Sequence, residues 1–339
     1  MPRSLVTGGA GFIGAHVVTA LCDRGHEVVA LDDLSGGFPD NVDERARLVE
    51  GSIVDHRLVD ELFTREGFEQ VFHCAAYAAE GLSHFIKRFN YTNNVIGSVN
   101  LINASVNHDV DCFVFTSSIA VYGAGQLPMT ESLKPEPEDS YGIAKYAVEQ
   151  ELAASREMFG LDYVTFRPHN VYGELQNIGD RYRNVIGIFI NQIMQGEPLS
   201  IFGDGEQTRA FSYVGDIVPA IAAAPETPAA RGETFNVGAD VPYSINQLAQ
   251  AVKEAMGVAE HPAVHHEARS EVVHAFSDHT KAREAFGEAG VTSLEEGVAR
   301  MVEWARRHGP RATAPFAGIE IERGLPAAWR QETAAEAGP

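Results

Sequence analysis

Residues 7–14 read "TGGAGFIG" and place glycines at positions 8, 11 and 14 directly after a short apolar run. The stretch lies between an expected strand over 3–8 and an expected amphipathic helix over 11–25. Gly8 would permit a tight turn, Gly11 would let the backbone approach a pyrophosphate, and Gly14 would let the helix pack close to the strand. A plain tight turn also uses glycines, but the strand–loop–helix context favours a dinucleotide site with its phosphates at the helix N-terminus.

A carboxylate follows at the end of the second expected strand, over residues 26–33. Asp32 comes eighteen residues after Gly14. A carboxylate at this place can accept hydrogen bonds from both ribose hydroxyls of NAD, and it would repel the extra phosphate of NADP. An aspartate that only caps a turn or helix is the alternative, and it fits Asp33 at least as well. We therefore assign Asp32 to NAD.

The first half of the chain alternates between strand-like and helix-like segments, which is typical of right-handed βαβ units on a parallel sheet. The sequence therefore predicts an α/β protein with a Rossmann doubly wound parallel sheet. After about residue 172 the alternation loosens, which favours a smaller mixed α/β lobe over the C-terminal edge of the sheet. Strands are expected at 3–8, 26–33, 46–52, 69–76, 111–118, 161–173 and 233–238, and helices at 11–25, 56–67, 93–108, 141–160, 184–199 and 244–257.

The composition excludes several classes of protein. The 339 residues include 45% hydrophobic and 22% charged side chains, and the net charge is −21. A surface with this much negative charge repels nucleic acid and anionic lipid. Neither is therefore an expected partner. Three separated cysteines, no signal peptide and no long apolar run predict a cytoplasmic protein. The histidines of "HHEARSEVVH" (265–274) lack metal-ligand spacing, and no metal site is expected.

Two further stretches, "SSIAVYG" (117–123) and "YGIAK" (141–145), combine a serine with a tyrosine four residues before a lysine. Tyr141 and Lys145 would share one face of a helix. A tyrosine titrates near pH 10, so a base that works at neutrality needs its pKa lowered by about three units. A lysine ammonium and a positive nicotinamide both push the pKa in that direction. Coincidental spacing is the alternative, and the preceding Ser118 argues against it.

Together with "LDDLSGG", "HCAA", "NNVIGSVNL" and "RPHNVYG", these motifs resemble an extended short-chain dehydrogenase/reductase. Within that superfamily the chain is similar to the nucleotide-sugar epimerases and dehydratases, most closely the UDP-glucose 4-epimerase group, to about residue 305. The resemblance implies an NAD-binding Rossmann domain over 1–172, to which later segments return, and a nucleotide-sugar-binding lobe over 173–308. Residues 309–339 would form an irregular tail. It also implies tightly bound NAD, a UDP-sugar substrate and a homodimer.

The resemblance also implies the site residues. Ser52 stands where the family usually has an aspartate that contacts adenine, and Arg269 lies one residue from the family position of a second phosphate-binding arginine. A surface ion pair is the alternative role for Arg209. The implied catalytic residues are Ser118, Tyr141 and Lys145. The implied cofactor-binding residues are Gly8, Gly11, Phe12, Ile13, Gly14, Asp32, Ser52, Ile53, Ala75, Ala76, Asn94, Tyr141 and Lys145. The implied substrate-binding residues are Ser83, Ser118, Tyr141, Asn170, Asn184, Val185, Arg209 and Arg269.

The two residues after Ser118 narrow the expected reaction. Related dehydratases carry an acid pair there, because eliminating water needs a general acid and a general base, and related decarboxylases carry a glutamate. Ile119 and Ala120 can do neither, which favours oxidation at one carbinol carbon and return of the hydride to the other face. The leading hypothesis is 4-epimerisation of a UDP-hexose of the UDP-glucose/UDP-galactose type. UDP-glucuronate as substrate is the alternative, and a 4-ketoreductase or a non-catalytic NAD-sensing protein is more distant.

Overall fold

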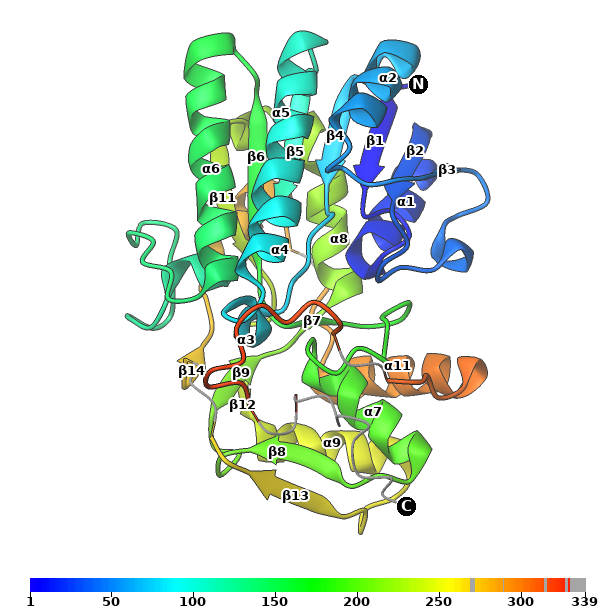
Figure 1. Ribbon diagram of the computed structural model, residues 1–339, viewed down its shortest axis with the longest axis vertical. Helices are drawn as coiled ribbons and strands as arrows, with labels where there is room; N and C mark the ends of the chain where they lie inside the picture. The colour runs from blue at the N-terminus through cyan, green and yellow to red at the C-terminus, as the bar shows by residue number, and fades with distance from the viewer. Residues whose placement is uncertain (269–271, 289, 314–315, 327–328, 330–339) are drawn as a thin grey trace, which may run out of the picture.

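A computed structural model describes residues 1–268, 272–288, 290–313, 316–326 and 329 of the chain (Figure 1). Its centre is a seven-stranded sheet in the order β11-β6-β5-β4-β1-β2-β3, in which every neighbouring pair is parallel. The predicted doubly wound parallel sheet is therefore confirmed. The strands of this sheet are β1 (Arg3–Thr7), β2 (Glu27–Asp32), β3 (Arg47–Glu50), β4 (Gln70–His73), β5 (Cys112–Thr116), β6 (Tyr163–Pro168) and β11 (Glu233–Val237).

Helices cover both faces of the sheet. One face carries α1 (Phe12–Asp23) against α8 (Val214–Ala223). The other carries α2 (His56–Glu66), α5 (Gly97–Asn107) and α6 (Ser140–Phe159), packed side by side as Figure 1 shows. This arrangement buries the strands on both sides, as parallel sheets require.

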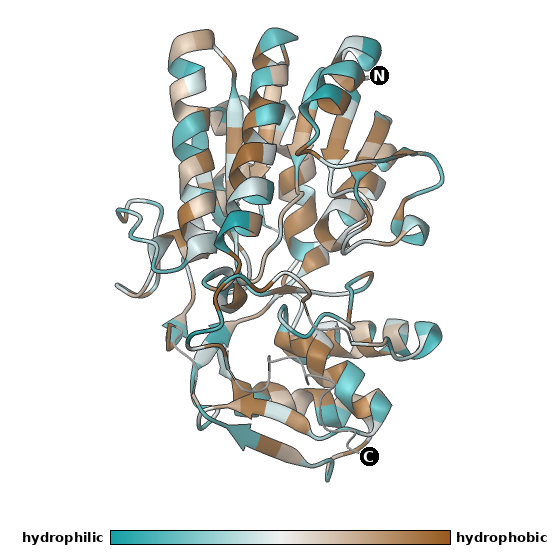
Figure 2. Ribbon diagram, viewed as in Figure 1, coloured by the Kyte–Doolittle hydropathy of each residue, from teal (hydrophilic) through white to brown (hydrophobic). Residues whose placement is uncertain are grey.

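Alternate residues of β1 divide between the two hydrophobic clusters of the Rossmann domain. Leu5 packs among side chains of α2, α5 and α6, whereas Val6 packs among those of α1 and α8. This is the two-residue period of a strand whose faces are both covered by helices. In Figure 2 the strands of the sheet are mostly hydrophobic, whereas the helices beside them are of mixed character.

A smaller lobe lies below the carboxyl ends of the strands (Figure 1). In it, β9 pairs antiparallel with β12 and parallel with β14, and β8 pairs parallel with β13. Its buried side chains continue the cluster on the α1 and α8 face of the sheet, so the two parts share one core. Its strands are β8 (Leu199–Phe202), β9 (Thr208–Ala210), β12 (Pro242–Ser244), β13 (Ala263–His266) and β14 (His274–Ala275), and its helices are α7 (Val185–Gln195), α9 (Ile245–Met256) and α11 (Leu294–His308).

Short elements connect these parts. The remaining ones are α3 (Glu80–Ser83), α4 (Lys87–Tyr91), α10 (Thr280–Phe286), the paired strands β7 (Val171–Tyr172) and β10 (Ser212–Tyr213), a π-helical turn (Thr92–Ile96), and 3-10 turns at Pro39–Asn41, Ile119–Tyr122, Ala224–Glu226 and Pro228–Ala230. Within the described ranges, no helix combines the length and the apolar character needed to cross a bilayer.

Two predicted elements differ from the structure. The strand expected over 161–173 is interrupted, because Asn170 adopts a positive φ of 40° between β6 and β7. The helix expected over 184–199 ends at Gln195, where Gly196 adopts a φ of 73° as its left-handed cap, and β8 begins at Leu199. Both differences follow from single residues in the left-handed region, which periodicity does not reveal.

Candidate active site

A cleft of about 700 Å³ opens at the carboxyl ends of the parallel strands, between the sheet and the smaller lobe. The loops after β1, β4, β5 and β6 line one side of it, and residues of α7, β8 and β9 line the other. The sheet order reverses direction between β1 and β4. Ligands of doubly wound sheets bind at this switch point.

The glycine loop after β1 is closed tightly enough to require glycine at two positions. Gly8 adopts a φ of 69°, and a Cβ there would lie 2.8 Å from the backbone of Ala75. A Cβ on Gly14 would lie 2.0 Å from the carbonyl oxygen of Gly8. The roles predicted for the turn and for close packing of α1 are therefore visible in the backbone.

Asp32 lies across this loop with its carboxylate held by backbone amides. One oxygen accepts from Ala10 N at 3.0 Å and from Gly11 N at 3.1 Å, and the other accepts from Leu34 N at 2.8 Å. Burial raises the pKa of Asp32, and these amides oppose that shift. The carboxylate lines the cleft and keeps lone pairs that can accept from hydroxyl groups.

The other predicted cofactor residues divide into two groups. Phe12, Ile13, Ser52, Ile53, Ala75 and Ala76 line the cleft together with the three glycines. Asn94 is buried instead, where its amide exchanges hydrogen bonds with the backbone of Tyr77 (2.9 and 3.1 Å) and donates to Asn90 Oδ1 (2.8 Å). Its described contacts fix the chain next to Ala76.

Tyr141 and Lys145 project from the first turns of α6, which Asp139 caps by accepting from Gly142 N at 2.8 Å. Lys145 Nζ donates to the carbonyl oxygen of Thr116 at 2.7 Å and lies 5.7 Å from the centre of the Tyr141 ring. Ser118 follows β5 on the same side of the cleft, and its Oγ accepts from Ala120 N at 3.1 Å. The structure thus brings the three predicted catalytic side chains to one wall of the cleft.

The protein chain by itself shifts the pKa of Tyr141 in the direction opposite to the one expected. Burial raises the pKa of Tyr141, with smaller contributions from Glu80 and Asp139, while a hydrogen bond with Ser118 works against them. Burial also lowers the pKa of Lys145 to about 8. The lowering of the Tyr141 pKa that was expected from the sequence is therefore not produced by the protein chain alone.

Behind Ser118, a buried ion pair ties β5 to β6 and α6. Ser117 Oγ donates to Glu149 Oε1 at 2.5 Å, and Arg167 Nε donates to the same oxygen at 3.0 Å. Arg167 also donates to the hydroxyl of Tyr122 at 2.7 Å. Because each charge has its partner, the network is a rigid support for the catalytic wall.

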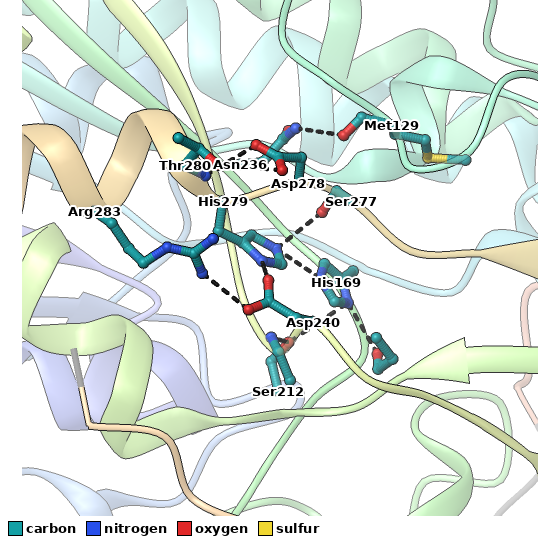
Figure 3. Close-up of polar contacts among 12 residues, drawn as sticks. Met129, His169, Ser212, Asn236, Asp240, Ser277, Asp278, His279, Thr280 and Arg283 are labelled. Carbon is teal, nitrogen blue, oxygen red and sulfur yellow. Dashed lines mark hydrogen bonds and ion pairs between the residues drawn. The ribbon is translucent and has the colours of Figure 1, made fainter. Parts of the chain in front are cut away.

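A second network, with two buried histidines at its centre, joins the end of β6 to the smaller lobe (Figure 3). The rings of His169 and His279 are stacked with their Nε2 atoms 3.0 Å apart, and His279 Nδ1 lies 2.6 Å from an oxygen of Asp240. His169 Nδ1 donates to the carbonyl oxygen of Ala210 at 2.9 Å. This network fixes the chain immediately before Asn170.

The predicted substrate residues lie mainly on the lobe side of the cleft. Asn170 and Asn184 both line it with positive φ values, 40° and 55°, and Asn184 caps α7 by accepting from Ile186 N at 3.3 Å. Val185 and Arg209 line the cleft as well, and Arg209 also donates to the backbone oxygens of Thr208, Val272 and Val273. Arg269 lies outside the described residues.

Ser83 is buried in α3 rather than exposed to the cleft. Sequence reasoning also missed several cleft residues, because their positions depend on how distant loops meet. The cleft residues that follow β4 could have been predicted, because the loops at the carboxyl ends of parallel strands line the ligand site. The missed lining residues include Tyr77, Glu80, Gly81, His84 and Trp329. Among the described residues no cluster of three His, Cys, Asp or Glu side chains is placed to hold a metal ion.

This fold and cleft define the chain as a dinucleotide-binding dehydrogenase/reductase. The profile of the NAD dependent epimerase/dehydratase family matches residues 4–238, and the chain belongs to that family. A UDP-glucose 4-epimerase of Mycolicibacterium smegmatis is 36% identical over 311 residues, which covers 90% of this chain and 98% of the relative. The predicted family and its NAD cofactor are thereby confirmed.

Two solved structures share the whole architecture. UDP-glucose 4-epimerase of Thermotoga maritima, solved with UDP-glucose, has a TM-score of 0.85 and 36% identity, covering 90% of this chain and 99% of its own. UDP-glucuronic acid 4-epimerase of Bacillus cereus, solved with UDP-glucuronic acid and NAD, has a TM-score of 0.81 and 28% identity over 90% and 99% of the two chains. The comparisons confirm the predicted NAD-dependent nucleotide-sugar epimerase and leave its sugar open.

Proposed function

We propose that this protein is a UDP-hexose 4-epimerase that interconverts UDP-glucose and UDP-galactose and keeps NAD bound throughout. Support for the nucleotide and the sugar comes from the Mycolicibacterium smegmatis and Thermotoga maritima relatives. The proposal includes the division of labour expected from the sequence, with residues 1–172 holding NAD and residues 173–308 holding the UDP-sugar. It also includes a homodimer, which the mass of the protein in solution tests.

The observation that carries the reaction type is the surroundings of Ser118. Ile119 is 6% exposed and packs in an apolar cluster with Val121 and Met129, turned away from the cleft lining. The position after the serine therefore supplies no acid to the sugar. Epimerisation at carbon 4 needs no acid at this position. The same group can take one proton from the 4-hydroxyl and return one to it.

The chain's own groups would divide that work as follows. Bound NAD supplies the acceptor for the hydride of carbon 4 and later the donor. Tyr141 takes the proton of the 4-hydroxyl, directly or through Ser118, and gives it back to the ketone oxygen. Lys145, fixed by Thr116, holds the nicotinamide ribose and keeps a positive charge near the phenolate.

The nucleotide end must stay fixed while the 4-keto sugar turns over to present its other face. Asn184 and Val185 stand where α7 begins, and Arg209 of β9 lines the same cleft. An N-terminal helix end and an arginine both favour a diphosphate. We assign these residues to the diphosphate and uracil, and Asn170 to the junction with the sugar.

UDP-glucuronate is the second candidate substrate. It is favoured by the Bacillus cereus neighbour and by two arginines, Arg181 and Arg183, that line the cleft. Arg183 forms an ion pair with Asp180 and stacks over Tyr77, with its guanidinium carbon 4.9 Å from the ring centre. Its charge is therefore already balanced by a carboxylate of the protein. That pairing makes the neutral hexose the first choice.

A proton NMR time course on the purified protein without added cofactor tests the proposal. We expect UDP-galactose to appear from UDP-glucose at a rate well above that from UDP-glucuronate. Turnover of UDP-glucuronate alone would promote the second candidate. No epimer from either sugar, with no NAD released on denaturation, would overturn the proposal.

A further inference from the structure

Part of this chain has no match in a related solved structure. The Thermotoga maritima structure is matched over 99% of its own length by only 90% of this chain, which leaves roughly a tenth of the chain unmatched. The family profile matches residues 4–238, so residues 239–339 lie outside it. The last helix of the lobe, α11, ends at His308, and the chain continues beyond it to the cleft.

We call residues 316–326 and Trp329 the C-terminal strap. Figure 1 shows this segment, in red, running beside α3 between the Rossmann domain and the smaller lobe. Its backbone joins the Rossmann domain at Phe85, whose carbonyl oxygen accepts from Glu320 N at 2.8 Å and from Ile321 N at 3.2 Å. The strap is therefore docked by main-chain contacts and is not a loose tail.

Glu320 provides the polar anchor of the strap. Its two carboxylate oxygens accept from Arg88 N at 2.9 Å and from Phe89 N at 3.0 Å, in the first turn of α4. The first amides of a helix have no partner within it, and a carboxylate there is favourable. The carboxylate thus fixes α4 and the segment α3–α4 that leads to it.

Aromatic side chains form the apolar part of the contact. Leu325 and Trp329 are buried in one cluster with Leu82 and Ile86 of the α3–α4 segment. Trp329 also packs edge-on against Tyr182 at a centroid distance of 5.3 Å. The strap therefore contacts both α3 and the 173–184 loop.

Trp329 reaches the cleft itself. It lines the cavity beside Gly81, and a Cβ on Gly81 would lie 3.2 Å from its six-membered ring. Gly81 is two residues before Ser83, whose hydroxyl contacts the backbone of Tyr141. This is the end of the cleft where the hexose must lie if Tyr141 acts on carbon 4.

We propose that the C-terminal strap is part of the substrate site, and that Trp329 forms the apolar wall against which the hexose is held and selected. The proposal rests on the proposed function for the identity of the sugar. An indole offers a large, rigid apolar face with few rotamers to freeze, which suits the C–H face of a pyranose. Because Glu320 sets the position of the whole strap, it acts as a positioning residue.

The first test compares Trp329→Ala and Trp329→Phe with the wild type. We expect Trp329→Ala to raise KM for UDP-glucose about tenfold, and Trp329→Phe to restore most of it. The affinity for UDP alone and the bound NAD should not change. Arg323→Ala, an exposed position on the same strap, is the matched control and should behave as the wild type.

Glu320→Ala should also raise KM for UDP-glucose and leave UDP binding unchanged. A purely structural role would instead lower the melting temperature in both variants while the KM for UDP-glucose and the preference among UDP-sugars stay as in the wild type. That result overturns the proposal.

A second measurement does not depend on turnover. The chain has two tryptophans, and Trp304 is buried in α11 away from the cleft lining, so Trp304→Phe leaves Trp329 as the one indole. We expect UDP-glucose to change the emission of Trp329 more than UDP does. Equal responses to UDP and UDP-glucose would overturn the proposal. If the wild type turned over no UDP-sugar, the proposed function would fail while this titration still tested the strap.

Discussion

The hydroxyl of Ser83 accepts a hydrogen bond from the backbone N–H of Tyr141, with 3.1 Å between Oγ and N. The same hydroxyl donates to the carbonyl oxygen of Glu80 at 2.6 Å. The first turn of α6 is thereby tied to α3, which also contacts the C-terminal strap. The first N–H groups of a helix have no acceptor within it, and Ser83 supplies one for Tyr141. The contact therefore fixes the backbone from which the Tyr141 ring projects.

We therefore expect Ser83→Ala to act on catalysis through Tyr141. The change leaves a buried N–H without its acceptor, which costs about 1–3 kcal/mol in the free energy of unfolding. kcat should fall more than KM rises, and the bound NAD should stay. Ser105→Ala is the control, because it removes a buried hydroxyl that donates to the carbonyl oxygen of Leu101 within α5. A rise in KM with kcat unchanged would instead favour direct substrate binding by Ser83.

Tyr141→Phe should nearly abolish epimerisation without unfolding the protein. The ring that packs at the start of α6 is kept, and only the hydroxyl that moves the proton is lost. General acid–base groups contribute about 10²–10⁴-fold, so a fall in kcat of about 10³-fold is expected by the NMR assay. Tyr146→Phe, one turn further along α6 in the Ile119 cluster, is the control. Loss of bound NAD in Tyr141→Phe would mean that the hydroxyl is needed mainly to hold the cofactor.

The fold was predictable because its decisive signals are local. The turn at Gly8 and the close approach at Gly14 lie within one short segment, and Asp32 ends the adjacent strand. Steric limits on glycine and the strand–helix alternation therefore carry the prediction without knowledge of distant contacts.

The parts of the site that the sequence did not reveal depend on contacts between distant segments. Ser83 was expected to bind substrate and Asn94 to bind the cofactor, and in the structure both side chains bond to backbone at distant positions. Trp329 was placed in an irregular tail, because a segment without hydrophobic periodicity does not indicate which surface it packs against. The pKa of Tyr141 depends mainly on burial, and the spacing of Tyr141 and Lys145 in the sequence does not indicate how deeply the ring is buried.

Asp32→Asn should reduce the NAD that remains bound through purification. One carboxylate oxygen becomes an amide N–H₂ that faces either Leu34 N or the amides of Ala10 and Gly11, so a donor meets a donor. The ribose hydroxyls also lose a charged acceptor. Asp33→Asn affects an exposed side chain that accepts only from Ser35 N among its described contacts, and it should retain NAD. Equal NAD content in the two variants, measured by absorbance after denaturation, would contradict the assignment of Asp32.

The stacked pair of His169 and His279 should make the protein sensitive to acid. Burial lowers the pKa of His169 to about 3 and also lowers the pKa of His279. An unfolded histidine titrates near pH 6.5, so below that pH the unfolded chain binds protons that the folded chain does not. The free energy of unfolding should therefore fall as the pH drops from about 6.5 towards 5.

His169→Asn removes one of these titrating rings while its amide can still donate to the carbonyl oxygen of Ala210. We expect lower stability at pH 7.5, by about 1–3 kcal/mol, because His279 loses a buried partner. We also expect the free energy of unfolding to fall less steeply between pH 6.5 and 5. The slope against pH should correspond to about one proton fewer taken up on unfolding. Urea unfolding across this range measures both effects, and His56→Asn, at an exposed position of α2, is the control. An unchanged slope in His169→Asn would mean that His169 is already protonated in the folded protein, with its charge balanced through His279 and Asp240.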